Sequence, residues 1–405
     1  MEVSNEKLIS LIFLILFTFV IAGCSYNERP ITVRSGLSGD AENIEYSQPQ
    51  AGQLTASEWS DLKNYEFFLS LFKGTQESGE GIFTKSFNKG YFDTLNMVTV
   101  QVKNNDLYIG GASVELADEF GRTIYKAITN LNGYAYLFPQ TKDLDSISKI
   151  IIHHKDKVIS NQYRYSLDNN TLIMNINSEN NHEPVIEIMF VVDTTGSMGD
   201  EISYLKSEID YVINEVKTSN ENTTINLALL FYRDKGDSYI TKYFDFTTNI
   251  EEQRENLAKQ EAAGGGDYEE AVDIALDEAV SKNWSNKNTT KLLFHVLDAP
   301  PHYNQEDMTR FFNAICVASE KGIRMIPVAS SGVNKYTEYL LRNEAMMTGG
   351  TYVFLTNDSG IGEDHIEASV GETEVEYLNH LLVRLINEYH TGVEGEKIPY
   401  YSIEE

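Results

Sequence analysis

The sequence predicts an α/β protein with a doubly wound, mostly parallel sheet, preceded by a smaller β-sandwich. Over residues 183–391, apolar strand patterns alternate with helix patterns, which is typical of a parallel sheet covered by helices on both faces. Over residues 91–182 the hydrophobic period is two, and Gly, Asn and Asp turns separate the short strands, as in a sandwich. A chain of 405 residues is long enough for two or three domains.

The first 23 residues have the pattern of an export signal. Their apolar run, 8–22, is short for a membrane-spanning helix, which needs ~20 apolar residues, and small residues directly precede Cys24. This end resembles a bacterial lipobox, which implies cleavage before Cys24 and acyl chains that each contribute ~0.8 kcal/mol per buried methylene. We therefore expect a protein lipid-anchored to a membrane of the bacterial cell envelope, on the extracytoplasmic side. A plain membrane anchor is the alternative.

Two connecting segments precede the predicted sandwich. Residues 24–54 are polar and have little periodicity, which predicts a flexible tether. Residues 55–90 are expected to be helical, because Thr55 and Glu58 have the spacing of a capping box and an aromatic-rich apolar stretch follows them. We expect this helical segment to pack on the next domain.

The predicted sandwich contains distinct strand and turn signals. Valines alternate with polar residues over 98–102, and Asn132-Gly133 predicts a hairpin before a strand at 134–138. The motifs G-A-x-V-x-L, D-x-x-G and T-N-x-x-G-x-A-x-L follow one another over 111–137. They resemble the carboxypeptidase-regulatory-like, transthyretin-like sandwich, and the resemblance implies a spacer or a contact surface.

The region 183–391 contains the strand and helix patterns of the predicted α/β domain. Buried strands are expected over 185–193, 226–232, 323–328 and 351–355. A helix with apolar residues at spacings of three and four follows the first of them, and another helix closes the region before a tail of residues 392–405. His295 falls within a further strand pattern and is expected in the core.

The end of the first α/β strand carries the residues of a possible cation site. Asp193, Thr195 and Ser197 alternate directly after the apolar run, and Gly196 permits a tight turn between them. A carboxylate and two hydroxyls are the hard oxygen ligands that Mg²⁺ prefers. Ligands of open α/β sheets bind at the carboxyl ends of the strands, which is where this loop lies. The same residues also fit a strand-to-helix turn with polar caps.

Two later acidic residues favour the cation site. Asp267 lies between a glycine loop and a predicted helix, and Asp298 ends another apolar strand. With these motifs the region resembles the von Willebrand factor A domain and its metal-ion-dependent adhesion site. The resemblance implies that Asp193, Thr195, Ser197 and Asp298 hold a divalent cation, Mg²⁺ or else Mn²⁺ or Ca²⁺.

This sequence departs from the family pattern at one ligand. The family's threonine position falls on Gly266, which has no side-chain oxygen. Asp267 is therefore predicted to contribute an oxygen, directly or through water, although an aspartate before a helix is also a common N-cap. The glycine loop and the residues after Asp298 resemble the branch of the family that is attached to atypical alpha-type kinases, but no kinase signature is present. His302 is a further candidate for the rim of the site.

Composition limits the classes of partner. The formal net charge of −29 argues against nucleic acid and against electrostatic adhesion to anionic lipid. Of the two cysteines, Cys24 is expected to carry lipid, so Cys316 has no partner for an intrachain disulfide and is expected to be a small buried residue.

The function predicted from these residues is binding of a protein, not catalysis. The sequence has no phosphate loop ending in Gly-Lys-Ser or Gly-Lys-Thr, and Thr195 stands where a haloacid-dehalogenase-type phosphatase would need a second aspartate. No Gly-x-Ser-x-Gly elbow or Cys-His pair lies near the site. We expect a Mg²⁺-dependent adhesion or scaffold module whose protein partner offers a carboxylate. The alternatives are a metal-dependent hydrolase and a structural domain without a metal-dependent partner.

Overall fold

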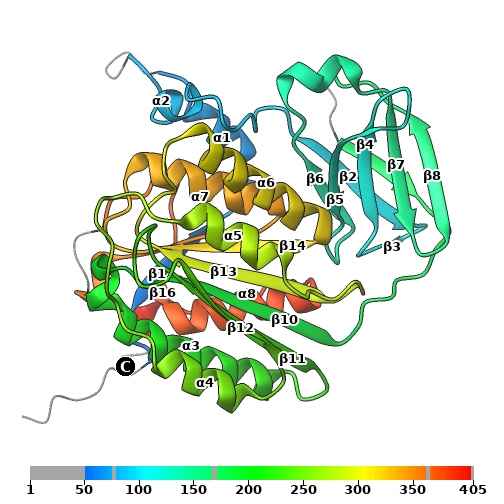
Figure 1. The fold of residues 1–405 in the computed structure, drawn as a ribbon. Helices are drawn as coiled ribbons and strands as arrows, with labels where there is room; N and C mark the ends of the chain where they lie inside the picture. Colours follow the sequence, from blue (N-terminus) through cyan, green and yellow to red (C-terminus); the bar gives the residue numbers. More distant parts are fainter. Residues whose placement is uncertain (1–50, 75–78, 167–170, 362–364, 403–405) are drawn as a thin grey trace, which may run out of the picture. The chain divides into compact units, whose positions relative to one another are not determined.

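The fold was analysed in a computed structural model, which describes residues 51–74, 79–166, 171–361 and 365–402 (Figure 1). These residues form a mixed α/β structure with one eight-stranded sheet and two four-stranded sheets. The predicted signal segment, the lipidation site at Cys24 and nearly all of the tether lie outside the described residues. Within the described residues, no helix combines the length and the apolar character needed to cross a membrane.

The eight-stranded sheet is parallel at its centre and antiparallel at its edges. In spatial order its strands are β12 (Thr241–Thr247), β11 (Thr224–Tyr232), β10 (Val185–Asp193), β13 (Thr290–Leu297), β14 (Ile323–Ala329), β15 (Tyr352–Leu355), β1 (Thr55–Trp59) and β16 (Glu376–Tyr377). The expected strand patterns in the α/β region therefore all belong to one sheet, which we call the α/β sheet.

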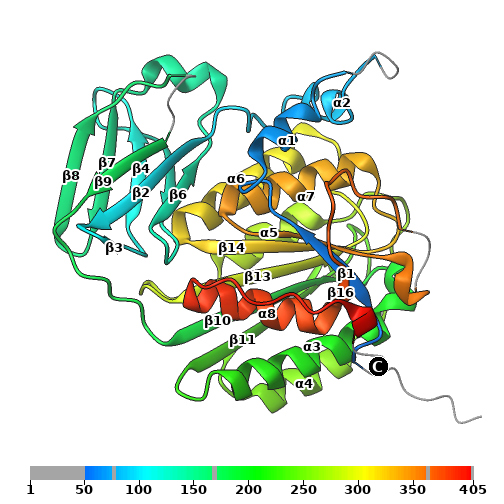
Figure 2. The same cartoon turned by 180° about the vertical axis from the view of Figure 1, so that it is seen from behind.

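Helices cover both faces of the α/β sheet, above and below it in Figures 1 and 2. One face carries α5 (Val272–Ser281), α6 (Gln305–Lys321) and α7 (Lys335–Thr348), and the other carries α3 (Gly199–Ser219), α4 (Ile250–Ala258) and α8 (Leu378–Thr391). Alternate residues of β10 enter two different cores: Met189 and Val191 join one, and Phe190 and Val192 join the other. Burial on both faces explains why β10 is a continuous apolar run.

The prediction of a helix that starts at Thr55 is wrong. Residues Thr55–Trp59 form β1, which pairs antiparallel with β15 and with β16, and helices appear only later, as α1 (Tyr65–Ser70) and α2 (Thr84–Phe87). The capping-box spacing is a local signal, and the ladder bonds of two neighbouring strands outweigh it here. The chain just before β1 is held by Glu208 of α3, whose carboxylate accepts hydrogen bonds from the backbone N–H groups of 52–54.

The two four-stranded sheets are built from residues 98–175, which we call the two-sheet region. One sheet contains β2 (Val98–Asn104), β3 (Leu107–Tyr108), β6 (Tyr134–Leu137) and β9 (Thr171–Asn175). The other contains β4 (Ser113–Ala117), β5 (Thr123–Ile128), β7 (Lys149–His154) and β8 (Lys157–Gln162). The Asn132-Gly133 turn forms, with Gly133 at φ +76°, but it joins β5 and β6 of different sheets and not a hairpin. The dipeptide specifies the turn, whereas strand pairing is decided by the packing around it.

Candidate functional site

The candidate site lies where two neighbouring parallel strands of the α/β sheet end. β10 ends at Asp193, and Asp298 directly follows the last residue of β13, the strand that pairs with β10. The chain leaves β10 toward β11 on one side, while β13 lies on the other side. Such a reversal in strand order separates the loops and leaves a crevice that open α/β sheets use for ligands. The fold therefore brings the two aspartates to one edge.

The loop after β10 arranges the first three predicted ligands. Oδ1 of Asp193 accepts hydrogen bonds from the backbone N–H of Thr195 at 2.8 Å and from its Oγ1 at 2.7 Å. Oγ1 of Thr195 lies 3.3 Å from Oγ of Ser197. Asp193 and Thr195 are buried, whereas Ser197 is exposed, so the three oxygens run from the interior to the surface. Within the described residues, the buried Oδ2 of Asp193 has no hydrogen-bond partner.

The glycine loop is attached to the first loop through backbone bonds. The N–H of Ala263 donates to the carbonyl of Thr194 at 3.0 Å, and the N–H of Gly196 donates to the carbonyl of Gly264 at 3.1 Å. Gly265 has φ +76°, and a Cβ there would lie 3.1 Å from Oε1 of Glu270 and 3.4 Å from Cβ of Thr195. Glycine is required by both the left-handed backbone and this close approach.

Glu270 is a site residue that the sequence analysis missed. Its backbone N–H donates to the carbonyl of Pro300 at 3.0 Å, and it forms a bridge with Pro301, so the glycine loop is joined to the loop after β13. The side chain is only 2% exposed, and its buried Oε2 has no hydrogen-bond partner in the part of the chain that the structure describes. The available signal was the pair of glutamates, Glu269 and Glu270, before α5, which begins at Val272.

The site concentrates negative charge away from water. Burial and, after it, the charge of Asp298 raise the pKa of Asp193 to about 7, although hydrogen bonds from Thr195 oppose the rise. Burial also raises the pKa of Glu270 to about 9, with contributions from Asp193 and other nearby carboxylates. No described Lys or Arg forms an ion pair with Asp193 or Glu270. Two buried carboxylates therefore lack a counter-charge from the described protein.

A buried polar chain lies behind Asp193. The hydroxyl of Tyr232 lies 3.3 Å from Nε2 of His295, and Nδ1 of His295 lies 3.1 Å from both carboxylate oxygens of Glu344 on α7. His295 is buried in β13, as expected for a core residue. Tyr232 stands on β11 opposite Asp193 of β10, so this chain lies directly beside the site.

Asp267 lies in a neighbouring group of side chains. It is exposed, and its carboxylate oxygen lies with ligand atoms of Asp234 and His302, all within 4.8 Å of one another. Nε2 of His302 is 2.7 Å from Oδ1 of Asp234. Gly266, at the family's threonine position, has open space where a Cβ would lie. The role of Asp267 as a metal ligand stays a prediction, and Glu270 is a second candidate for the missing oxygen.

The donor set fits a hard divalent cation. Asp193 and Glu270 each direct a buried carboxylate oxygen with no hydrogen-bond partner among the described residues into the site, and Thr195 and Ser197 add hydroxyls. Such buried charge is costly unless an opposite charge compensates for it. Mg²⁺, Mn²⁺ and Ca²⁺ all accept carboxylate and hydroxyl oxygens.

Comparison with protein families and curated proteins gives three matches. The family model of the von Willebrand factor A domain matches residues 187–358. A putative ariadne-like RING finger protein of Acanthamoeba polyphaga mimivirus is 26% identical over 219 residues, which cover 52% of this chain and 22% of the relative. The alpha-protein kinase vwkA of Dictyostelium discoideum is 30% identical over 118 residues, 29% of this chain and 19% of the relative. This chain therefore spans about a fifth of the length of each curated relative.

The solved structures to which this chain is similar include the following two. The conserved hypothetical protein BatB from Bacteroides thetaiotaomicron matches with a TM-score of 0.36 and 13% identity, covering 50% of this chain and 98% of that one. The pilus adhesin SpaC from Lactobacillus rhamnosus GG, in an open conformation, matches with a TM-score of 0.36 and 12% identity, covering 51% of this chain and 30% of that one.

Proposed function

Because residues 187–358 form a von Willebrand factor A domain, we propose that the chain is an adhesion or scaffold module that binds a protein in a cation-dependent way. The observation that carries this proposal is the pair of buried carboxylates, Asp193 and Glu270, which have oxygens without a hydrogen-bond partner among the described residues. Protein interaction in general agrees with the domain type, whereas the dependence on a cation rests on the site itself.

In this proposal the cation is Mg²⁺, with Mn²⁺ and Ca²⁺ as alternatives. Asp193, Thr195, Ser197 and Asp298 hold it, and Glu270 or Asp267 supplies the oxygen that Gly266 lacks. The bound ion would supply positive charge and a coordination position that a partner's carboxylate can take. Thr195 keeps the carboxylate of Asp193 oriented through its N–H and its hydroxyl, and the backbone bonds among the three loops keep the oxygens together.

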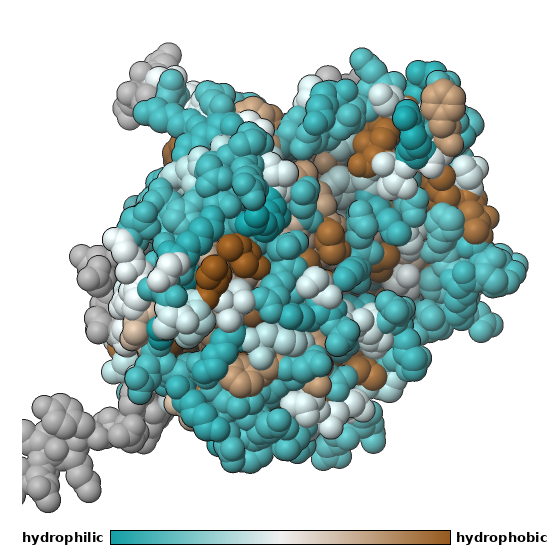
Figure 3. All heavy atoms as spheres, in the orientation of Figure 1, coloured by the Kyte–Doolittle hydropathy of each residue, from teal (hydrophilic) through white to brown (hydrophobic). Residues whose placement is uncertain are grey.

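The surface around the site suits a polar contact with aromatic support. Tyr268 and Tyr303 lie on the glycine loop and on the loop after β13, and both are 36% exposed. Partly exposed tyrosines provide apolar area and a hydroxyl, and they are enriched at protein interfaces. The face shown in Figure 3 is mostly hydrophilic, with hydrophobic residues in separate groups. A charge-assisted bond at the edge of the sheet would therefore carry much of the specificity.

We further propose that the module is held at a bacterial envelope membrane by lipid on Cys24, and that the site is not catalytic. The first proposal rests on the residues before Cys24 in the sequence. The second rests on the sequence, which has no phosphate loop ending in Gly-Lys-Ser or Gly-Lys-Thr and no nucleophile elbow or Cys-His pair near the site. In this proposal the ligand of the site is therefore a protein partner and not a substrate.

The proposal is tested by capturing partners from the native envelope with the soluble chain, in Mg²⁺ and in chelator. We expect capture to require Mg²⁺ and to be lost in Asp193→Asn, which keeps the size of the side chain. Asp277→Asn is the matched control, because Asp277 is an exposed aspartate on α5 away from the loops. Equal capture in Mg²⁺ and in chelator by well-folded protein would exclude cation-dependent adhesion.

A further inference from the structure

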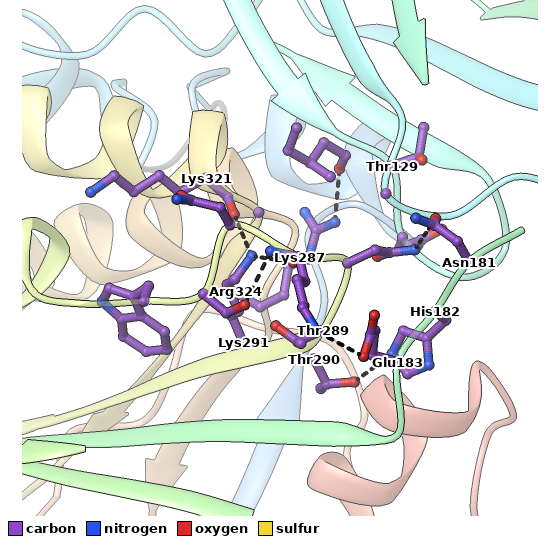
Figure 4. A pocket seen from close by; sticks show the side chains of 18 of the residues that line it. Thr129, Asn181, His182, Glu183, Lys287, Thr289, Thr290, Lys291, Lys321 and Arg324 are labelled. Atoms are coloured by element: carbon purple, nitrogen blue, oxygen red, sulfur yellow. Dashed lines mark hydrogen bonds and ion pairs between the residues drawn. The ribbon is translucent and has the colours of Figure 1, made fainter. Parts of the chain in front are cut away.

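A pocket of about 770 Å³ lies far from the candidate cation site, between the two-sheet region and the α/β domain. It is bordered by the chain before β13, by the C-terminal end of α6 and by the ends of β5 and β7 (Figure 4). The cation site lies at the carboxyl ends of β10 and β13, whereas this pocket lies at the amino end of β13. Its volume is within the range of small-molecule sites, ~300–1,000 Å³.

The charge of this pocket is opposite to that of the whole chain. Cationic side chains of Lys155, Lys282, Lys287, Lys291, Lys321 and Arg324 line it, against only two carboxylates, Glu183 and Glu320. In Figure 4, Lys287, Lys291, Lys321 and Arg324 lie close to one another on one side of the hollow. Because the chain has a formal net charge of −29, a surface region taken at random would be expected to be acidic. A positive concave site concentrates anions from solution.

The two innermost cations have carbonyl partners and no carboxylate. Nζ of Lys291 donates to the carbonyls of Lys287 at 3.1 Å and Lys321 at 3.3 Å. Arg324 donates to the carbonyls of Thr348 and Ile128, both at 2.8 Å. Both side chains are buried, and among the described residues neither they nor Lys321 form an ion pair with a carboxylate.

The carbonyl contacts explain only part of this arrangement. The carbonyls of Lys321 and Thr348 end α6 and α7, where a positive charge is favourable by about 0.3–1 kcal/mol. An ammonium group has three donors, so Lys291 keeps one after its two carbonyl bonds. Burial lowers the pKa of Lys291; the charge of Glu187 opposes this, and the charges of Arg324 and Lys321 add smaller decreases. Lys291, Arg324 and Lys321 repel one another, and an anion between them would reduce this repulsion.

We propose that this pocket binds a small molecule carrying a doubly charged oxyanion of the phosphate-ester type. Lys287 and Lys321, whose ammonium groups contact Glu183 at 3.4 Å and the carbonyl of Val280 at 2.7 Å, would exchange these contacts for the oxyanion beside Lys291. Asparagine and threonine side chains of both regions contact the rest of the ligand. A single carboxylate would neutralise one of these cations, whereas a phosphate ester has about two charges and three acceptor oxygens. Charge-assisted bonds to lysine and arginine suit that group. This inference does not depend on the proposed adhesion function.

A ligand in this pocket would strengthen the contact between the two regions. Nδ2 of Asn288, on the chain before β13, donates to the carbonyl of Gly110 at 3.1 Å, and Arg324 reaches the carbonyl of Ile128. A Cβ on Gly111 would lie 2.3 Å from the side chain of Asn288, so the two regions are already packed closely there. A ligand that touches both regions stabilises the folded chain by mass action.

The test is thermal melting and calorimetric titration of the purified chain with inorganic pyrophosphate, phosphate and sulfate, without divalent cations because pyrophosphate binds Mg²⁺. We expect pyrophosphate to bind and to raise the melting temperature, more than phosphate or sulfate at equal ionic strength. Lys321→Gln and Lys291→Met should each weaken pyrophosphate binding at least tenfold. Lys321 is exposed, so its variant keeps the test valid if Lys291→Met does not fold.

Lys259→Gln is the matched control, because Lys259 is an exposed lysine after α4, outside the pocket. It should bind pyrophosphate like the parent. Binding weakened equally in Lys259→Gln and Lys321→Gln would show a general effect of charge and overturn the proposal. No binding of any of the three anions at millimolar concentration, by a folded parent, would overturn it as well.

Discussion

Two clusters of buried carboxylates in the α/β domain differ in the positive charge that compensates them. On α7, the fully buried Arg342 donates to both oxygens of Asp61, at 2.8 and 2.5 Å, and lies 3.5 Å from Glu338. Lys335 adds a second cation 2.9 Å from Glu338. At the ends of β10 and β13, Asp193 and Glu270 are equally buried, yet no described Lys or Arg pairs with them.

The difference separates a structural cluster from a binding site. The protein itself supplies the opposite charge around Arg342, so removing one partner there would leave a buried charge without compensation. At the candidate cation site the compensation has to come from outside, through an ion or through protons. Burial alone therefore does not single out a candidate site, and the lack of a counter-charge is what distinguishes Asp193 and Glu270 from the cluster around Arg342.

The largest effect is expected from Arg342→Met. It leaves Asp61 and Glu338 buried without their arginine and should lower the free energy of unfolding by about 3–5 kcal/mol. Denaturant unfolding followed by circular dichroism measures this. Arg254→Met is the control: Arg254 is a half-exposed arginine paired with Asp210, and its loss should cost at most about 1 kcal/mol. Equal losses in the two variants would contradict the contrast between the clusters.

The second effect concerns the missing counter-charge. Mg²⁺ at 100 times its dissociation constant should stabilise the parent by about 2.7 kcal/mol. Asp193→Asn should lose this gain, and in chelator it should be at least as stable as the parent, because it removes a buried charge that lacks compensation. Melting of both proteins in Mg²⁺ and in chelator gives the comparison. A variant destabilised in chelator as strongly as Arg342→Met would assign Asp193 to structure instead of binding.

A smaller effect distinguishes the two candidates for the missing oxygen. If Glu270 is the ligand, Glu270→Gln should weaken Mg²⁺ binding about tenfold, roughly 1.4 kcal/mol, and Asp267→Asn should change it less than threefold. If Asp267 is the ligand, the order is reversed and Asp267→Asn should match Asp298→Asn. Isothermal titration with Mg²⁺ and Mn²⁺ measures all three variants. Unchanged binding in both Glu270→Gln and Asp267→Asn would reject both candidates.

A further effect is expected from pH, without any substitution. The folded-state pKa values of Asp193, about 7, and Glu270, about 9, lie above the unfolded values of ~3.9 and ~4.3. Without a cation, the folded state binds more protons, so stability should fall as pH rises from ~4 toward 9. Between pH 6 and 8 we expect a clear drop in melting temperature, because each group that is protonated only in the folded state loses ~1.4 kcal/mol of its contribution per pH unit.

With saturating Mg²⁺ this dependence should weaken or reverse, because the cation replaces the protons and binds more tightly at higher pH. In Asp193→Asn with Glu270→Gln, the dependence without a cation should be lost. A parent protein whose stability in chelator rises with pH over this range would contradict the placement of these carboxylates.

Local patterns were sufficient for the parallel strands of the α/β sheet and for the common edge at which Asp193 and Asp298 lie. Asp193, Thr195 and Ser197 follow an apolar run that reads as a buried strand, and Asp298 follows another, so their common edge could be predicted from the sequence. Glu270 could not be selected, because three acidic residues occur within 267–270 and its burial depends on the backbone bond to Pro300.

Features that depend on distant contacts were beyond the sequence patterns. The spacing of Thr55 and Glu58 favours a helix locally, but strand pairing with β15 decides the structure. The basic pocket is equally invisible in the sequence, since its lysines are scattered from 155 to 321 and meet only after the two-sheet region packs on the α/β domain.

The position of β1 has a consequence for the order of folding during synthesis. The hydroxyls of Thr55 in β1 and Thr356 after β15 lie 2.8 Å apart, although the residues are 301 positions apart in the chain. At 5–20 residues per second, β1 leaves the ribosome about 15–60 s before its partner strands. Contacts of such high sequence separation form slowly. Insertion of β1 between β15 and β16 is therefore a late folding event, which links the two ends of the described chain in one cooperative step.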